Sequence, residues 1–424
     1  MHSNKRVFIT GISALASTGL TAEKVWDSLV EGKTGIDEIT SYDLKNWQYR
    51  LGGELKDFQA AKMLPDRKLL KVISKHDAYG IQAAVQAIEN SQIINYRENL
   101  DSKDEFNDRT AVYVGSPGNK YFQQHDFLPL LAKTGKDMKQ FAKQLFDIVH
   151  PMWLLRILPN NVLAYTGITY GLKGPNHNIT NHAVGGMQAL IEAYHAIKTG
   201  QAERAVVVAY DLATEPQALF YYAQLGVISS SHLKPFDQKH NGTILAEGAA
   251  ALVLESEESV KKRTATCYAE VCGGFSATEH NGLFTINEQG NALAEVIKSA
   301  LAYENIQNSD VGLIVAHGNG NKKSDISEAQ AINQVFKEVP VTAYKWSMGH
   351  TVCASGVLDT VLTTLAYKNR CIPGIANLDN PAKECGNLNV STNHRTLDNN
   401  KPYSVIINRG FASINAALVM RACE

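Results

Sequence analysis

Three histidines stand next to turns that follow apolar, strand-like runs, where an imidazole can transfer a proton or stabilise an anion. His182 stands in T-N-H-A-V-G-G, His317 in V-A-H-G-N-G, and His350 in S-M-G-H-T-V. A histidine beside glycine at the end of a strand lies close to backbone groups and open to substrate, as acyl-transfer chemistry requires. A lone histidine in a turn is more often an ordinary hydrogen-bonded residue, so this chemistry needs support from the rest of the chain.

The segment around Ala183 has the pattern of a strand-to-helix turn that carries the nucleophile in many enzymes. An extended run from Asn178 ends in a turn, and an amphipathic helix follows as far as Lys198, where Gly200 ends it. Backbone N–H groups and the positive end of the helix dipole point to the tip of such a turn. That tip carries alanine, so the sequence predicts a nucleophile site without a nucleophile.

The elements that must position these turns are strands alternating with helices, which is typical of α/β layers. Strand-like runs lie at residues 6–10, 110–114, 205–209, 249–254, 311–316 and 403–407. Helical patterns lie at 22–31 and 75–90, after position 183, and from about 354. The order of strands and turns is similar in two halves. We expect them to stack face to face, so that their strand-end turns meet at one site.

The predicted boundary between the halves is a charged stretch near 255–262, which gives residues 1–257 and 258–424. Residues 116–163 are expected to form an irregular insert that caps the core or contributes to a dimer surface, since a loop of this length is seldom without a function. The strand at 205–209 is expected to form part of the dimer interface.

Composition excludes several functional classes. The 424 residues include 41 basic and 42 acidic side chains, which gives no electrostatic basis for binding nucleic acid or an anionic membrane. No apolar run approaches the roughly 18 residues of a spanning helix, and the N-terminus lacks an apolar signal core. Six scattered cysteines without a C-x-x-C pair fit a reducing compartment. We therefore expect a cytoplasmic protein.

Other kinds of site chemistry have little support. His317, Asp325, His350 and Cys353 include no pair at helical metal-ligand spacing, so no metal site is predicted. The stretches G-N-G-N-K-K and C-G-G-F match neither a dinucleotide-binding motif nor a Walker loop. Cys353 is the one thiol near a histidine turn, and we do not expect it to replace the nucleophile because the helix after the turn is aimed at position 183.

These turns, in this order, resemble the β-ketoacyl-acyl carrier protein synthases, the elongating ketosynthases of fatty acid and polyketide assembly. Further similarity lies in R-V-F-I-T-G-I-S-A-L-A-S-T-G near the start, Y-G-L-K-G-P before the elbow, and K-P-F-D-Q-K-H-N-G-T-I-L-A-E-G from Lys234. The resemblance covers essentially the whole chain. It implies a thiolase-like fold with a duplicated five-layer α-β-α-β-α architecture. It also implies that no cofactor is needed and that substrates arrive on the phosphopantetheine arm of acyl carrier protein.

The resemblance assigns roles to individual residues. The family's nucleophilic cysteine falls on Ala183, and its two active-site histidines fall on His317 and His350. The N–H groups of residues 183 and 411 would form an oxyanion hole for the acyl thioester. The two histidines would stabilise the enolate of the malonyl thioester. Residues that match the family's supporting lysine and acidic pair are Lys345, Glu328 and Asp325.

Residues 408–415 are similar to the family's glycine-rich gate loop, and Phe411 takes the place of the gating phenylalanine. Arg409 is a departure, because that position is normally apolar. His182 and Asn181 are also unusual beside the elbow, where the family more often has small residues. We expect these side chains to narrow the substrate pocket or to indicate a specialised substrate such as a polyene.

The alanine at position 183 leaves three explanations open. The chain is a ketosynthase whose cysteine has been replaced, a natural partner similar to chain-length factors, or a protein that decarboxylates malonyl-carrier protein without acyl transfer. The retained histidines favour the first and third, since chain-length-factor-like partners often lose them. The A-V-G-G run favours the second, because it is similar to the elbow of those partners. The protein is expected to be a homodimer or a heterodimer with a ketosynthase.

A scaffold that only binds carrier protein is a fourth, non-enzymatic alternative. Carrier proteins are acidic, so a basic patch is expected near the mouth of the pocket. Residues 64–75 supply Arg67, Lys68, Lys71 and Lys75. The same pattern is equally typical of a solvated helix face.

Overall fold

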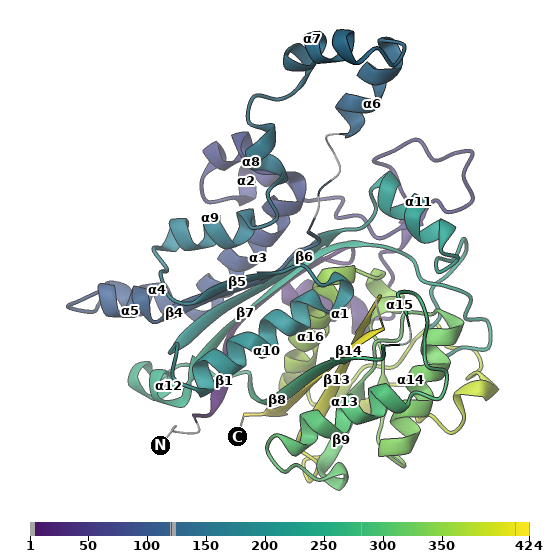
Figure 1. Cartoon of the computed structure of the whole chain (residues 1–424). Helices are drawn as coiled ribbons and strands as arrows, with labels where there is room; N and C mark the ends of the chain where they lie inside the picture. Colours follow the sequence, from purple (N-terminus) through teal and green to yellow (C-terminus); the bar gives the residue numbers. More distant parts are fainter. Residues whose placement is uncertain (1–4, 119, 121–123, 281, 412, 424) are drawn as a thin grey trace.

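Two half-sheets, with helices around and between them, make up the body of the protein (Figure 1). The computed structural model describes residues 5–118, 120, 124–280, 282–411 and 413–423. Within these residues, ten strands form one hydrogen-bonded sheet. One half has the order β5 (Asn176–Ile179), β4 (Thr110–Gly115), β6 (Arg204–Leu212), β7 (Glu247–Ser256) and β1 (Val7–Ala16). The other has the order β10 (Val341–Thr342), β9 (Val311–Val315), β13 (Tyr403–Gly410), β14 (Ile414–Ala422) and β8 (Ala269–Thr278).

The two halves have the same strand directions. β4 pairs parallel with β5 and β6, and β9 pairs parallel with β10 and β13. The remaining pairs within each half, β6–β7–β1 and β13–β14–β8, are antiparallel. Within the described residues, the two half-sheets are hydrogen-bonded to each other where the start of β1 pairs with the start of β8, over Val7–Ile9 and Ala269–Val271. The predicted boundary at residue 257 falls between β7 and β8.

Helices complete the five layers. α10 (Gly185–Lys198) and α16 (Ser355–Asn369) contact each other between the half-sheets (Figure 1). On the outer faces, α3 (Lys75–Ser91) packs on β1, β6 and β7, and α13 (Asn291–Ala302) packs on β8 and β14, with α14 (Lys322–Val335) beside α13. α3 begins with a capping box in which Ser74 and Asp77 bond to each other's backbone N–H groups. α10 and α16 are the central layer, and the turn that leads into α10 lines the site described below.

The remaining elements are shorter or peripheral. The helices are α1 (Ala22–Val30), α2 (Ala60–Met63), α4 (Ile93–Glu98), α5 (Asp104–Asp108), α9 (Asn161–Tyr170), α11 (Pro216–Gln224), α12 (Glu257–Arg263) and α15 (Lys345–Met348). The strand pairs are β2 (Asp37–Glu38) with β3 (Leu51–Gly52), and β11 (Cys371–Ile372) with β12 (Arg395–Thr396).

All six strand-like runs of the sequence are strands in the structure, because their continuous apolar residues are buried on both faces. The prediction that the strand at 205–209 helps to form a dimer interface is wrong in one respect, because its backbone has no free edge to pair with a second chain. β6 is paired on both sides, by β4 and β7, and each of its residues is buried. The edge strand of this half-sheet is β5.

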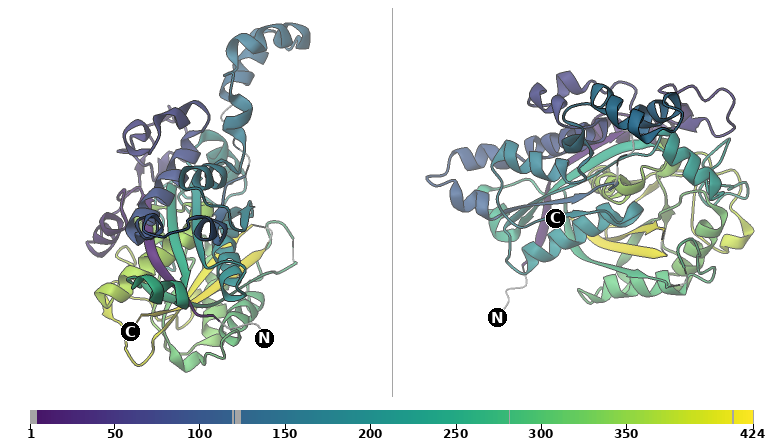
Figure 2. Two further views of the ribbon diagram at one scale, coloured as in Figure 1. Left: turned by 90° about the vertical axis from the view of Figure 1, so that its left-hand side faces the viewer. Right: turned by 45° about the horizontal axis from the view of Figure 1, so that its top comes forward.

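The insert at 116–163 is largely helical rather than irregular, although residues 119 and 121–123 lie outside the described residues. It contains α6 (Gln124–Lys133), α7 (Met138–Ile148) and α8 (Trp153–Ile157). Figures 1 and 2 show α6 and α7 standing off the body as an arm, not lying over the core. α7 has no buried residue, and Phe146 is 86% exposed. The arm thus presents apolar surface without a partner in this chain.

Candidate active site

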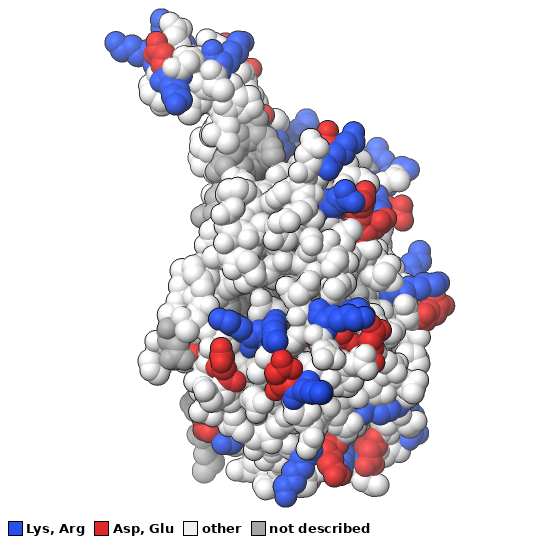
Figure 3. All heavy atoms as spheres, turned by 90° about the vertical axis from the view of Figure 1, so that its right-hand side faces the viewer, with Lys and Arg blue, Asp and Glu red and all other residues white. Residues whose placement is uncertain are grey.

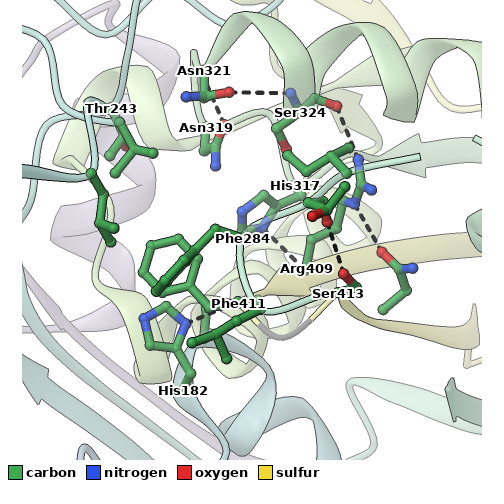
Figure 4. Close-up of a pocket in the computed structure, with 18 of the residues that line it drawn as sticks. His182, Thr243, Phe284, His317, Asn319, Asn321, Ser324, Arg409, Phe411 and Ser413 are labelled. Atoms are coloured by element: carbon green, nitrogen blue, oxygen red, sulfur yellow. Dashed lines mark hydrogen bonds between the residues drawn. The ribbon is translucent and has the colours of Figure 1, made fainter. Parts of the chain in front are cut away.

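The turns predicted to carry the chemistry meet at a pocket of about 130 Å³ (Figure 4). His182 and Ala183 line it from a 3₁₀ turn ahead of α10, His317 from the turn after β9, and His350 from the turn after α15. Phe411 lines it from the end of β13. The structure therefore brings position 183, the three histidines and the gate phenylalanine together.

His317 and His350 form an edge-to-face pair, with ring centroids 5.1 Å apart. The backbone N–H of Arg409 donates to Nδ1 of His317 at 3.4 Å, so the neutral ring carries its proton on Nε2. Burial, followed by the positive charge of Lys345, holds the pKa of both histidines well below 6.5. Both rings are therefore neutral at pH 7, and His317 can donate an N–H to a developing oxyanion.

Lys345 does not line the pocket. Its ammonium bonds to the carboxylate of Asp359 at 2.9 Å, and both side chains are 2% exposed. This buried ion pair holds the Lys345 side chain in place. Lys345 therefore affects the histidines through its charge. Its partner Asp359 was not identified from the sequence, because it lies fourteen positions further on, in α16, beyond the turn that carries His350.

Glu328 and Asp325 hold the backbone that carries His317. Glu328 accepts the N–H groups of His317 at 2.6 Å and Gly318 at 2.9 Å, and burial raises its pKa to about 7. Asp325 accepts the N–H of Gly320 at 3.2 Å and a bond from Nδ1 of His240 at 3.0 Å. The acidic pair thus positions the turn without touching the pocket. His240 is a supporting residue that the sequence analysis did not identify.

Arg409, the predicted departure from the family, lines the pocket but its guanidinium is bound by protein groups. It donates to Glu279 at 3.1 Å, to Asn415 at 2.9 Å, and to Ser324 and Ser327 at 3.0 and 3.2 Å. Glu279 is also buried and also lines the pocket. This ion pair, between residues 130 positions apart, ties the start of the gate loop to neighbouring segments and makes one wall of the pocket polar. Ala412 of the gate loop lies outside the described residues.

The elbow has the tight packing that the A-V-G-G run suggests. A Cβ atom on Gly186 would lie 2.5 Å from the carbonyl oxygen of Cys353, so this position needs glycine for α10 and α16 to approach. A Cβ atom on Gly410 would lie 3.5 Å from the backbone nitrogens of Ala183 and Val184. The gate loop thus passes directly over the N–H groups at the tip of the elbow.

His182 occupies the space between elbow and gate. Its ring stacks on Phe411 with centroids 4.4 Å apart and bonds to the hydroxyl of Tyr222. The N–H of Phe411, which the resemblance assigns to the oxyanion hole, donates to Nδ1 of His182 at 3.4 Å. Asn181 does not line the pocket, since its amide bonds to Gln188 of α10 at 2.9 Å.

Cys353 lies beneath the elbow and does not line the pocket. Its side chain is fully buried, and burial and the nearby Asp211 carboxyl hold the pKa of its thiol well above 9. A neutral, enclosed thiol is a poor nucleophile. This agrees with the expectation that Cys353 does not replace the absent cysteine.

The basic residues Arg67, Lys68 and Lys71 form an exposed 3₁₀ turn, Arg67–Lys71, next to α2. No ion-pair partner is found for these three in the described part of the chain. None of these three residues lines the pocket, and Figure 1 shows the neighbouring α2 well away from α14 and α15. Figure 3 shows the face on the α11 and α14 side, where basic and acidic side chains are interspersed.

The described residues contain neither a candidate membrane span nor a candidate metal site. No helix among them is long and apolar enough to cross a bilayer. No group of three or more His, Cys, Asp or Glu side chains is arranged there to hold a metal ion.

Comparison with known protein families decides the identity of this fold. Residues 4–259 match the family described as beta-ketoacyl synthase, N-terminal domain, and residues 268–379 match the beta-ketoacyl synthase, C-terminal domain. The chain belongs to the β-ketoacyl synthase family. The thiolase-like fold predicted from the sequence is therefore confirmed.

Relatives of this β-ketoacyl synthase family member cover its full length. It is 27% identical over 438 residues to 3-oxoacyl-[acyl-carrier-protein] synthase 2 of Staphylococcus aureus (strain N315), covering 100% of both chains. Among solved structures, the ishigamide ketosynthase/chain length factor superposes with a TM-score of 0.87 at 23% identity over 99% of this chain and 100% of that one. One chain of a solved complex, a type II PKS acyl-carrier protein with its ketosynthase, superposes on this chain with a TM-score of 0.82 at 23% identity. The match covers 99% of this chain and 100% of that chain.

Proposed function

We propose that this chain binds a malonyl thioester carried on acyl carrier protein and removes its carboxylate, without forming a covalent acyl-enzyme. The observation that carries this proposal is the pairing of two neutral, enclosed histidines with a methyl group at the elbow. The histidines supply what decarboxylation needs, and Ala183 lacks the sulfur that acyl transfer needs. Condensation through an acyl-enzyme is therefore expected to be absent.

The proposed step needs no cofactor. The bond between the malonyl methylene and its carboxylate breaks, CO₂ leaves, and the electron pair moves onto the thioester oxygen as an enolate. N–H groups of His317 and His350 stabilise this oxygen, because each neutral ring keeps one N–H to donate to it. Protonation of the enolate carbon by water gives the acetyl thioester.

Intact-mass spectrometry of malonyl-carrier protein mixed with the chain tests the proposal. We expect conversion to acetyl-carrier protein and no mass added to the chain. The variant Ala183→Cys, incubated with acyl-carrier protein, should gain an acyl adduct and then elongate it with malonyl-carrier protein. Absence of acetyl product, or an adduct on the unaltered chain, would contradict the proposal. Failure of Ala183→Cys to take up acyl groups would favour a structural partner instead.

The second candidate is a non-condensing subunit that pairs with an active ketosynthase. The exposed apolar surface of the arm supports it: Leu128, Met138 and Phe146 are each more than half exposed. Apolar surface on this scale is typical of a protein interface. One structural relative is a ketosynthase/chain length factor, and another binds acyl carrier protein. Size-exclusion chromatography of the chain alone and with a ketosynthase from the same source separates homodimer from heterodimer.

A further inference from the structure

The ring of His182 is held from three sides at the boundary between the pocket and an apolar cluster. It stacks on Phe411 at 4.4 Å and on Tyr222 at 5.9 Å between centroids, with an interplanar angle of 22° in both cases. Figure 4 shows His182 and Phe411 side by side at one end of the pocket, opposite Thr243, Asn319 and Asn321. One end of the pocket is thus aromatic and the other is polar.

Both ring nitrogens of His182 are bonded to protein groups. Nδ1 accepts the N–H of Phe411, so the neutral ring carries its proton on Nε2 and donates it to the hydroxyl of Tyr222. Burial lowers the pKa of His182 to about 4, which keeps the ring neutral. The backbone of His182 has φ of 50°, a left-handed conformation that is unfavourable for a non-glycine residue. The surrounding contacts therefore fix this ring in one orientation.

Behind the ring lies an apolar cluster separate from the two large cores. Its buried members include Ala183, Leu219, Tyr222, Ile228 and Val352, and Phe411 packs against it. Ala183 and Phe411 therefore belong both to the pocket and to this cluster. An alkyl chain attached beside position 183 would meet the rings of His182 and Tyr222, which bond to each other and line the pocket next to this cluster.

We propose that His182 sets the size of the acyl group admitted at position 183. Its ring, bonded to Tyr222 and stacked on Phe411, closes the apolar end of the pocket, so the site takes thioesters of malonyl or acetyl size and excludes longer alkyl chains. Nδ1 of the same ring accepts the N–H of Phe411. A thioester oxygen must therefore displace the His182 ring to accept a hydrogen bond from this N–H. The inference rests on the proposed function in taking an acyl thioester as the ligand.

The test uses a thiol at position 183 as a reporter and does not depend on carrier protein. Ala183→Cys is treated with N-alkyl iodoacetamides of increasing tail length, from methyl to octyl, and labelling at residue 183 is followed by peptide mass spectrometry. The same series is run on Ala183→Cys/His182→Ala and on Ala183→Cys/Tyr222→Phe, which keeps both rings and removes one hydrogen bond. The matched control is Ala183→Cys/His195→Ala, because His195 lies on α10, the helix that follows His182, and contacts an aromatic ring, but does not line the pocket.

We expect the octyl reagent to label Ala183→Cys at least about tenfold more slowly than the methyl reagent. His182→Ala should remove most of this difference, Tyr222→Phe part of it, and His195→Ala none. Equal labelling by methyl and octyl reagents in Ala183→Cys would overturn the inference. An unchanged ratio of methyl to octyl labelling rates in both the His182→Ala and the Tyr222→Phe variants would also overturn it. If His182→Ala fails to fold, Tyr222→Phe still provides the test, because it preserves the packing of the ring.

The outcome is distinguishable from failure of the proposed function. If tail length controls labelling through His182 but malonyl-carrier protein is not decarboxylated, the size limit holds and the proposed activity is wrong. If decarboxylation occurs and tail length has no effect, the proposed activity holds and the size limit is wrong.

Discussion

The two halves of the protein contain the same kind of elbow, and only one of them borders the pocket. In the first half, the 3₁₀ turn His182–Val184 leads into α10; in the second, the 3₁₀ turn Val352–Ala354 leads into α16. Both turns start on a non-glycine residue with positive φ, 50° at His182 and 39° at Val352. The second residue is Ala183 in one turn and Cys353 in the other, so the chain has its thiol in the elbow that does not meet substrate.

This comparison shows that a helix N-terminus does not by itself make a thiol reactive. Cys353 has the turn and the helix that favour a thiolate, and yet burial and the Asp211 carboxyl hold its pKa well above 9. Ala183 has the same backbone setting, with the N–H groups facing a pocket and two neutral histidines. Reactivity therefore depends on what faces the tip of the elbow, and in this protein that environment surrounds a methyl group.

The largest expected effect is the difference between thiols placed at the two elbows. In Ala183→Cys, we expect iodoacetamide to label residue 183 at least about a thousandfold faster than Cys353, because the first thiol faces the pocket near a helix N-terminus and the second is enclosed and neutral. Peptide mass spectrometry of a time course at pH 7 measures both rates in one sample. Comparable rates would mean that burial does not separate the two elbows.

Replacing a histidine of the second half tests whether the machinery around the empty elbow is functional. We expect His317→Ala to lower decarboxylation of malonyl-carrier protein by about a hundredfold or more, because it removes an enclosed N–H donor to the enolate oxygen. His350→Ala should have a similar effect. In the double variant the rate should fall by less than the product of the two single fold-reductions, because both histidines act on the same oxygen. The rate is measured as release of CO₂.

An unchanged rate in both single variants would show that the histidines are retained for structure alone. The matched control is His394→Ala, since His394 is exposed and bonds to backbone groups away from the pocket. This control should decarboxylate at the rate of the unaltered chain.

The fold and the reacting residues were largely predictable, because their signals are local. Continuous apolar runs identified β4, β6, β7 and β9, and the turns after them identified His317 and the elbow. Partners across the fold were not predictable. Nothing in the sequence near Arg409 indicates that its guanidinium pairs with the carboxylate of Glu279, which follows β8.

The pairing of His182 with Tyr222, and the arm formed by α6 and α7, were missed for a related reason. The first depends on how α11 packs against the elbow, forty residues away along the chain. The second has helical periodicity without the buried face that would identify it within one chain, since no residue of α7 is buried. Contacts made through tertiary packing have no local pattern in the sequence.

The titration of His182 gives a smaller, thermodynamic measure of the first elbow. Its pKa in the folded chain is about 4, below the 6.5 of an exposed ring, so the unfolded chain binds the extra proton first as pH falls. The folded state is therefore fully stabilised above about pH 6.5, and it loses about 3 kcal/mol from this residue as the pH falls to 4. Urea unfolding at pH 7 and pH 4.5 should show a weaker pH dependence in His182→Gln. His195→Gln is the control, because His195 is half-buried and lies outside the pocket. If the free energy of unfolding changes equally with pH in the unaltered chain and both variants, His182 is not the source of this pH dependence.

The smallest expected effect concerns the second elbow and decides which feature keeps Cys353 unreactive. Asp211 accepts the N–H of Cys353 at 3.2 Å, and burial raises the pKa of its carboxyl to about 7, so it carries only part of a charge at neutral pH. Burial is the larger cause of the raised pKa of the Cys353 thiol, and the thiol stays buried in Asp211→Asn. We therefore expect Cys353 labelling in Asp211→Asn to rise less than about tenfold. A rise that brings Cys353 near the rate of an exposed thiol would instead make the carboxyl the main difference between the elbows, and one substitution would then suffice to activate the thiol in the half without substrate.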